Sequence, residues 1–362
     1  MPEKKRPELY GSGLLRVILI APKFGGHFFG AIDYRSNALR LQSLAEIQRR
    51  AKIIMVLQTL KKLSKSRETF LMRCLFLAIM FHAIMIVAVR TAAASDDVAP
   101  NAVRKPIPDR LVVLTFDDSS KSHYTVVRPI LKQYGFGATF FITEGFDFKS
   151  NKKDYMTWEQ IRELHDDGFE IGNHTRDHLG ITEKTLNQLP EQLDGIARQC
   201  EAYGIPAPVT FAWPGNAISP DAAEMLKDHG ILFARRGGAP EYPYDEGRGF
   251  AFQPGLDHPR LIPSAGDARP RWTLPDFVRA VRQARDGRIA VLQFHGVPDT
   301  AHDWVSSQQQ NFEAYMKFLS LEGYRVVALR DLIEYVDPAI VPADVNAVIE
   351  ARRKTLQTET NP

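Results

Sequence analysis

The sequence has 362 residues, of which 44% are hydrophobic and 25% are charged. These proportions are ordinary for a globular protein, so they exclude a collagen, a coiled coil and a wholly disordered chain. The length is compatible with one large domain plus extensions or with two domains. The only cysteines are Cys74 and Cys200, which excludes a disulfide-based scaffold and a cysteine-rich zinc module.

The charge is divided unevenly along the chain. Residues 1–71 contain 14 Lys and Arg against 5 Asp and Glu, whereas residues 72–362 contain 32 against 38. The net charge of +3 therefore combines a basic N-terminal segment with a mildly acidic main body. An acidic body is a poor binder of nucleic acid through its overall field, so we expect no nucleic-acid partner.

An apolar run without charged residues covers residues 74–89, preceded by Arg73 and followed by Ala92-Ala93-Ala94. A basic start, an apolar middle and a small-residue exit are the parts of a secretory signal, and the run is shorter than the roughly 20 residues of a comfortable spanning helix. We expect residues 72–94 to be a signal peptide starting at Met72, and residues 1–71 to be a basic extension from a mispredicted start. The alternatives are an uncleaved anchor, which would be the chain's only contact with a membrane, and a buried core helix. The signal-peptide interpretation makes the body secreted or periplasmic, and the anchor interpretation makes it membrane-anchored.

From about residue 108 to residue 337, predicted strands and helices alternate. In chain order we expect strand 111–115, helix 124–134, strand 138–142, a helix from Thr157 to Gly168, strand 169–172, a helical region 182–203 kinked or split at Pro190, strand 209–212, a helix from Pro220 ending before Gly230, strand 231–234, helix 273–285, strand 289–294, helix 307–321, strand 325–328 and helix 330–336. Thr157 begins a capping box, and Ser219-Pro220 is an N-cap followed by proline at the first helical position.

This alternation predicts an α/β domain with a parallel sheet, either open or closed into a barrel. Residues 237–270 are rich in Gly, Pro and Asp, and we expect a long excursion there with one short strand near Leu261. The C-terminal tail, 338–362, is predicted to be helical and peripheral. In either sheet form, catalytic groups lie just past the carboxyl ends of strands.

Three segments place reactive side chains at such strand ends. Asp117 and Asp118 follow the first strand, His174 and His178 follow the third, and His295 ends a late strand. Two histidines and one carboxylate can hold a divalent metal with an open position for water. The second carboxylate can take a proton from that water, and the late histidine can protonate the leaving group. Each piece alone is weak, because aspartates often cap helices and paired histidines are often unrelated, but their combination is specific.

The order of these motifs resembles the polysaccharide deacetylase family, also called NodB-like or carbohydrate esterase family 4-like, over residues 110–336. The matching stretches are Thr115-Phe-Asp-Asp118, His174-Thr-x-x-His178, Pro214-Gly215 and Leu292-x-Phe-His295. The resemblance implies a distorted (β/α) barrel with about seven strands.

The resemblance also implies the roles of the site residues. A divalent metal, zinc first with cobalt, nickel or manganese as alternatives, would bind Asp118, His174 and His178. Asp117 would be the general base and His295 the general acid. Water on the metal would attack an N-acetyl carbonyl of a carbohydrate substrate, and a backbone N–H near Gly215 would help to hold the oxyanion.

The sequence departs from the family pattern at three places. Ser119 replaces the glycine that usually follows the aspartate pair. Ala212-Trp213-Pro214-Gly215-Asn216 stands where the family has Arg-x-Pro-aromatic-Gly, so the arginine that usually holds the base is missing. Arg271 stands where the family has an aspartate that tunes the late histidine. Arg235 or Arg236 could replace the missing arginine, although a solvated or ion-paired arginine is an equally good interpretation, and Asp267 could replace the missing acid.

Several other side chains are candidates for binding or tuning the substrate. They are Trp213, Pro214, Gly215, Trp272, His302 and Trp304. Trp213 and Trp272 could stack on sugar rings, although buried tryptophans are more often plain core. His302 and Trp304 could border the cleft. His123 could line the site, but we expect it to be an exposed histidine at a helix start.

The leading hypothesis is a secreted, metal-dependent deacetylase of an N-acetylated or O-acetylated glycan. One alternative is a hydrolase of another non-peptide C–N bond, such as a small amide. The other is a carbohydrate-binding protein that has lost turnover; Asp117 and His295 speak against it, and the missing arginine speaks for it. An open groove with exposed tryptophan would favour a polymer, and a pocket covered by residues 237–270 would favour a small molecule.

Overall fold

The computed structural model describes residues 104–360, so the predictions for residues 1–71 and 72–94 lie outside the described residues. The strands of the described part are β1 Leu111–Phe116, β2 Thr139–Ile142, β3 Glu170–Asn173, β4 Thr210–Ala212, β5 Phe233–Arg235, β6 Gly266–Asp267, β7 Ala290–Phe294 and β8 Arg325–Val327. All pairs between these strands are parallel, as the alternation of strands and helices predicts.

The strands form one curled sheet. Their order is β5-β4-β3-β2-β1-β7-β6, and β8 pairs with the first half of β1. The chain just before β6 connects the two ends of this order: the Ile262 N–H donates to the Ala234 carbonyl of β5 at 2.9 Å, and the Ala265 N–H donates to the Val291 carbonyl of β7 at 2.7 Å. The predicted α/β fold, a distorted barrel with about seven strands in its main path, is confirmed.

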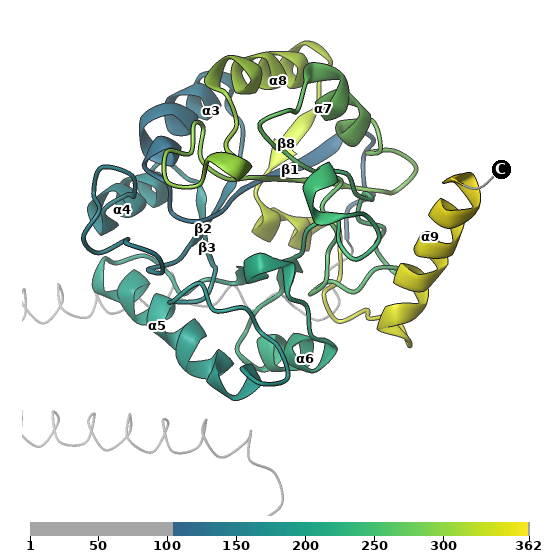
Figure 1. Ribbon diagram of the computed structural model, residues 1–362, viewed down its shortest axis with the longest axis horizontal. Coiled ribbons are helices and arrows are strands. Elements are labelled where there is room, and N and C mark those ends of the chain that lie inside the picture. Colours follow the sequence, from purple (N-terminus) through teal and green to yellow (C-terminus); the bar gives the residue numbers. More distant parts are fainter. Residues whose placement is uncertain (1–103, 361–362) are drawn as a thin grey trace, which may run out of the picture. The chain divides into compact units, whose positions relative to one another are not determined.

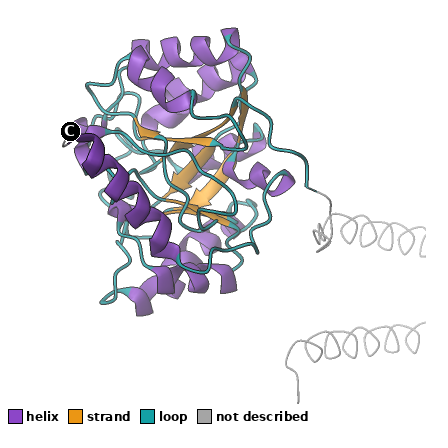
Figure 2. Ribbon diagram, turned by 90° about the vertical axis from the view of Figure 1, so that its right-hand side faces the viewer, coloured by secondary structure: helices purple, strands orange, loops and turns teal. Residues whose placement is uncertain are grey.

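The strands are apolar on both faces because both faces are covered. Leu111 and Val113 of β1 belong to the apolar cluster inside the barrel, whereas Val112 and Leu114 belong to the cluster shared with the surrounding helices. Figure 2 shows the strands in the centre of this unit with helices outside them. Burial on both faces explains why the sequence shows continuous apolar runs here.

The helices are α3 Arg128–Tyr134, α4 Trp158–Asp166, α5 Leu189–Ala202, α6 Pro220–Asp228, α7 Leu274–Val281, α8 Gln309–Leu321 and α9 Val345–Thr360. Short 3₁₀ or π turns lie at His123–Val127, Leu186–Gln188, Pro214–Asn216, Tyr244–Glu246, Asp303–Val305 and Leu329–Glu334. The helices α3 to α8 surround the strands, and α9 lies outside this ring (Figure 1). Both predicted N-caps are present, at Thr157 and Ser219, and Gly135 ends α3 in a left-handed conformation.

Three details differ from or refine the sequence prediction. Pro190 does not kink a long helix but lies in the first turn of α5, where its missing N–H costs nothing. The excursion 237–270 contributes a bridge at Ile262 and the two-residue strand β6 rather than a strand at Leu261. The tail is helical, and Arg352 of α9 pairs with the buried carboxylate of Asp257 at 2.7 and 2.9 Å.

Among the described residues, no helix combines the length and the apolar character needed to cross a membrane. The apolar run 74–89 is not among those residues.

Candidate active site

The predicted reactive segments meet at one end of the barrel. Asp117 directly follows β1, His174 directly follows β3, and His295 directly follows β7. Because neighbouring strands are parallel, their carboxyl ends lie together, and this is the end at which barrels of this type carry their chemistry. The side chains of β1 that face the inside of the barrel change from apolar to polar toward this end. Leu111 and Val113 are followed by Thr115, so a polar layer covers the apolar core.

A pocket of about 160 Å³ opens at this end. It is lined by Asp117, Asp118, Phe146, His174, His178, Trp213, Gly215, Asn216, Tyr244, Gln293, His295, His302, Trp304 and Val305. The predicted metal ligands, base and acid are therefore brought together in a single cavity.

Asp118, His174 and His178 have the spacing of a metal site. The Nε2 atoms of both histidines lie 3.3 Å from Oδ1 of Asp118, and the three ligand atoms all lie within 4.8 Å of one another. Ligand atoms that are each about 2.0–2.1 Å from a tetrahedral metal are about 3.3 Å apart. Oδ1 of Asp118 is buried and has no hydrogen-bond partner among the described residues. The three side chains therefore fit a divalent metal.

The orientation of His174 supports this fit. Its Nδ1 lies 2.9 Å from the carbonyl of Ala212, which can only accept, so Nδ1 carries a proton and Nε2 can offer its lone pair. Burial raises the pKa of Asp118, but the imidazoles of His174 and His178 outweigh it and hold that pKa well below its ordinary value. Asp118 therefore offers an anionic oxygen to this candidate metal site.

Backbone strain is concentrated at these ligands. Asp118, Ser119 and His178 have φ angles of 71°, 57° and 53°, in the left-handed region that non-glycine residues seldom occupy. The departure from glycine at Ser119 has a local compensation, because its hydroxyl donates to the Thr143 carbonyl at 2.8 Å and accepts from the Thr143 N–H at 2.9 Å.

Asp117 is held by an arginine from a neighbouring strand. The Nη2 of Arg235 contacts both carboxylate oxygens, at 2.6 Å for Oδ2, and both side chains are buried. Arg235 lies opposite Ala212 in the register of β4 and β5, and Ala212 occupies the position of the arginine missing from the motif. Of the two predicted substitutes, Arg235 makes the contact, whereas Arg236 pairs with Glu241.

His295 has an acidic neighbour on each side. Its Nε2 lies 3.9 Å from Oδ2 of Asp118, and its Nδ1 lies 3.9 Å from Oδ1 of Asp267. Arg269 pairs with Asp267 at 2.5 Å. Burial raises the pKa of Asp267, while His295 and Arg269 oppose that effect. Asp267 therefore lies beside His295 without a hydrogen bond to it, and its tuning role stays a prediction. Arg271, at the usual position of the acid, is exposed.

The two tryptophans that were candidates for stacking on sugar rings are buried. Trp213 lines the pocket but is almost wholly buried, and its Nε1 donates to the Arg260 carbonyl at 2.9 Å. Trp272 packs in the core, where its carbonyl accepts from Tyr315 Oη at 3.0 Å, and it does not line the pocket. A sugar-stacking role for Trp272 is therefore not supported, and Pro214 is buried as well.

The expectation that His123 is exposed was wrong. The side chain is buried beneath the site, with Nε2 3.1 Å from the carbonyl of His295, and burial lowers its pKa to about 4. His302 and Trp304 border the pocket as predicted.

Five residues of the pocket were not predicted from the sequence. They are Phe146, Asn216, Tyr244, Gln293 and Val305. Gln293 donates from Nε2 to Asp117 at 3.3 Å, and its position two residues before His295, on the same face of β7, was the available indication. Phe146 and Tyr244 lie in loops, where no periodic pattern indicates the direction of a side chain.

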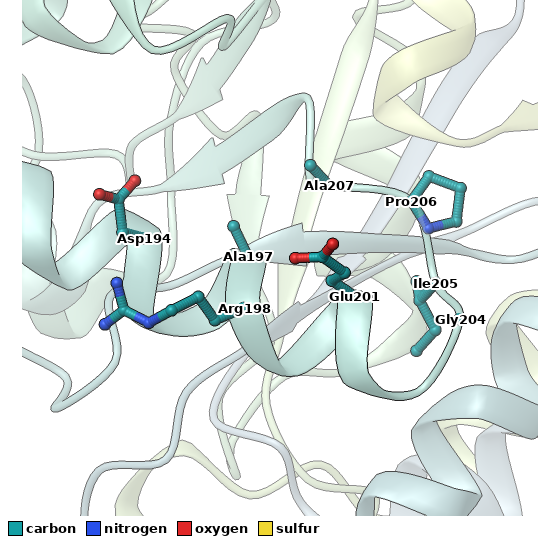
Figure 3. A pocket seen from close by; sticks show the side chains of 8 residues that line it. All are labelled: Asp194, Ala197, Arg198, Glu201, Gly204, Ile205, Pro206 and Ala207. Atoms are coloured by element: carbon teal, nitrogen blue, oxygen red, sulfur yellow. The ribbon is translucent and has the colours of Figure 1, made fainter. Parts of the chain in front are cut away.

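A larger hollow lies away from this chemistry. About 610 Å³ of space lies between α5 and the loop 204–207, with Asp194, Arg198 and Glu201 along the helix (Figure 3). None of these residues belongs to the Asp-His-His cluster, so size alone does not indicate the site.

The described geometry can be compared with known proteins. The sequence profile of the family described as "Polysaccharide deacetylase" matches residues 104–234, which include the three metal-site residues. This match supports membership of the polysaccharide deacetylase family for residues 104–234. The match ends one residue before Arg235, so the relocated arginine lies outside the profile.

The relatives are named as deacetylases. The chain is 26% identical over 237 residues to the peptidoglycan-N-acetylglucosamine deacetylase of Bacillus cereus, covering 64% of this chain and 91% of the relative. It is 34% identical over 89 residues to the peptidoglycan-N-acetylmuramic acid deacetylase PdaA of Bacillus subtilis, covering 24% and 31%. A solved structure, a family 4 acetyl xylan esterase from Clostridium thermocellum with a cobalt ion, is 22% identical with a TM-score of 0.44, covering 64% of this chain and 95% of that one.

Proposed function

We propose that this protein is a metal-dependent hydrolase that removes acetyl groups, N-linked or O-linked, from a polysaccharide. The observation that carries the proposal is one pocket lined by the Asp118-His174-His178 cluster together with Asp117 and His295, each of which has a charged partner behind the pocket wall. Asp117 with Arg235 forms one pair, and His295 with Asp267 forms the other. The names of the relatives support acetylated glycans as the substrate class.

The roles follow from the positions of the side chains. When bound, a divalent metal, with zinc as our first choice, would polarise the acetyl carbonyl and lower the pKa of a coordinated water. Asp117, held in position by Arg235, accepts the proton of the attacking water. His295 donates a proton to the departing nitrogen or oxygen of the sugar, and the carboxylate of Asp267 lies 3.9 Å from its Nδ1. The net change is addition of water across the acetyl bond, which yields acetate and a free amine or hydroxyl.

The side chains around the pocket help to choose between the proposed deacetylase and the two alternatives, a small-amide hydrolase and a binding protein without turnover. Trp304 and Phe146 are exposed at the mouth, which favours a polymer over a small amide enclosed by residues 237–270. Arg235 supplies the cation that the motif lacks, and this weakens the argument for a binding protein without turnover. From the composition of residues 72–94 we further propose that the reaction occurs outside the cytoplasm.

The test is acetate release from oligomers of N-acetylglucosamine and from acetylated xylan by the metal-loaded full chain. Asp117→Asn should abolish release, because the amide cannot accept the proton. Asp221→Asn, an exposed aspartate in the first turn of α6, is the matched control and should release acetate at the normal rate. No release from any of these glycans, with one metal bound per chain, would refute the proposal.

A further inference from the structure

A buried histidine lies directly beneath the proposed general acid. His123 opens the π turn His123–Val127, and its side chain has no exposure to solvent. Its Nε2 lies 3.1 Å from the carbonyl oxygen of His295. A carbonyl can only accept a hydrogen bond, so Nε2 of His123 carries a proton and donates the bond. His123 takes no part in the proposed proton transfers, so its buried polar ring needs another explanation.

We propose that His123 is a positioning residue, which fixes the backbone of His295 and thereby holds the imidazole of His295 where it can protonate the leaving group. This inference rests on the proposed function. His123 does not line the pocket, so it acts through the general acid and not on the substrate.

The imidazole of His295 is not fixed by its acidic neighbours. Oδ2 of Asp118 and Oδ1 of Asp267 each lie 3.9 Å from a ring nitrogen of His295, which is beyond hydrogen-bond distance. Nδ1 of His295 is buried and has no hydrogen-bond partner among the described residues. The direction of the ring therefore depends on the backbone that carries it.

The backbone of His295 leaves the sheet at this position, because β7 ends at Phe294. Two side chains from the loop after β1 hold the first residues beyond the strand. His123 binds the carbonyl of His295 at 3.1 Å, and Oγ of Ser122 accepts from the N–H of Val297 at 2.7 Å. These two hydrogen bonds fix the peptide groups that follow His295, and with them the starting point of its side chain.

His123 is itself held rigidly in the core. Its ring packs against Phe116 of β1 and Phe140 of β2, with centroids 5.6 and 5.5 Å away. Burial lowers the pKa of His123 to about 4, so at neutral pH the ring donates its hydrogen bond without placing a positive charge beneath the site. π turns are rare and frequently lie at functional sites. A donor fixed in the core transmits the rigidity of the barrel to His295.

Two substitutions of similar size separate the hydrogen bond from packing. His123→Leu removes the donor, whereas His123→Gln keeps an N–H donor at the end of its side chain. The matched control is His258, another buried histidine whose pKa is lowered to about 4 by burial and which does not line the pocket. His258→Leu should also lower stability in urea unfolding, but it should leave acetate release unchanged.

The first measurement is acetate release by the zinc-loaded full-length chain. His123→Leu should lower kcat about tenfold or more, because misplacing a reacting group by about 1 Å can cost about a hundredfold in rate. KM and the affinity for zinc should stay unchanged, since His123 belongs neither to the pocket lining nor to the metal cluster. His123→Gln should recover most of the lost kcat. A normal kcat in His123→Leu, or an equal loss in His123→Gln or His258→Leu, would overturn the proposal.

A second measurement needs no substrate. The ring protons of the histidines are followed by NMR, and His295→Gln identifies the signal of His295. We expect one sharp His295 signal in the wild type and in His123→Gln, and a broadened or split signal in His123→Leu, because the ring is no longer held in one position. The same His295 signal in all three chains would refute the positioning role, whether or not acetate is released. A failure to release acetate, with the expected change in this signal, would refute only the deacetylase proposal.

Discussion

Arg235→Met is the substitution that best tests the proposed base. It leaves the buried carboxylate of Asp117 without the cation that contacts both of its oxygens. Removing one partner of a buried ion pair costs about 3–5 kcal/mol of stability, because the other charge is left desolvated. The guanidinium also fixes the position of the carboxylate, and misplacing a reacting group by about 1 Å can cost about a hundredfold in rate.

The assay is acetate release from an acetylated oligosaccharide at neutral pH, with stability followed in parallel by urea unfolding. Arg235→Met should lower kcat/KM about a hundredfold. Arg236→Met is the matched control, because Arg236 is the next residue, is equally buried and loses a comparable ion pair with Glu241 at 2.6 Å. It should lower stability similarly and leave kcat/KM nearly unchanged. Normal activity in Arg235→Met, or an equal loss of activity in both variants, would refute the reasoning.

Three further predictions concern stability. Burial lowers the pKa of His123 to about 4, so between pH 6.5 and 4 the unfolded chain binds a proton that the folded chain does not. Acidification through this window should therefore lower the free energy of unfolding by about 3 kcal/mol. In His123→Asn, the free energy of unfolding should depend less on pH. Arg352→Met should cost about 3 kcal/mol in urea unfolding because it leaves Asp257 buried and unpaired, whereas Arg353→Met, in an exposed pair, should change stability by less than about 0.5 kcal/mol. Zinc at about 100 times its Kd should raise the Tm of the wild-type chain by about 5–10 °C and that of His178→Ala by much less, and equal shifts would contradict the assigned ligands.

The fold and the centre of the site could be predicted because their patterns are local. Each strand is a short apolar run, and each reactive residue directly follows one, so the parallel arrangement alone brings Asp117, His174 and His295 to the same end of the barrel. The helix ends could be predicted for the same reason: Thr157 and Gln160 are three residues apart and satisfy each other.

The mouth of the pocket could not be predicted, because its side chains come from loops. The direction of Phe146 depends on a left-handed φ angle, which no apolar periodicity encodes. His123 was misjudged because a histidine at a helix start is usually exposed; here the loop after β7 covers it, and the His295 carbonyl lies 3.1 Å from its ring. Such contacts join segments far apart in the sequence.

Arg235 shows how a contact can be preserved when a motif is not. The family motif has the arginine that holds the base on one particular strand. A guanidinium from a neighbouring strand can reach the same carboxylate, as Arg235 does for Asp117. Ala212 and Arg235 are register partners on adjacent parallel strands, whose backbones are about 4.8 Å apart. The long side chain of arginine spans such a distance, and alanine at position 212 leaves room for it. The missing motif residue is therefore evidence about which strand supplies the cation, and an argument for lost activity must be made from the contacts of Asp117 rather than from the motif.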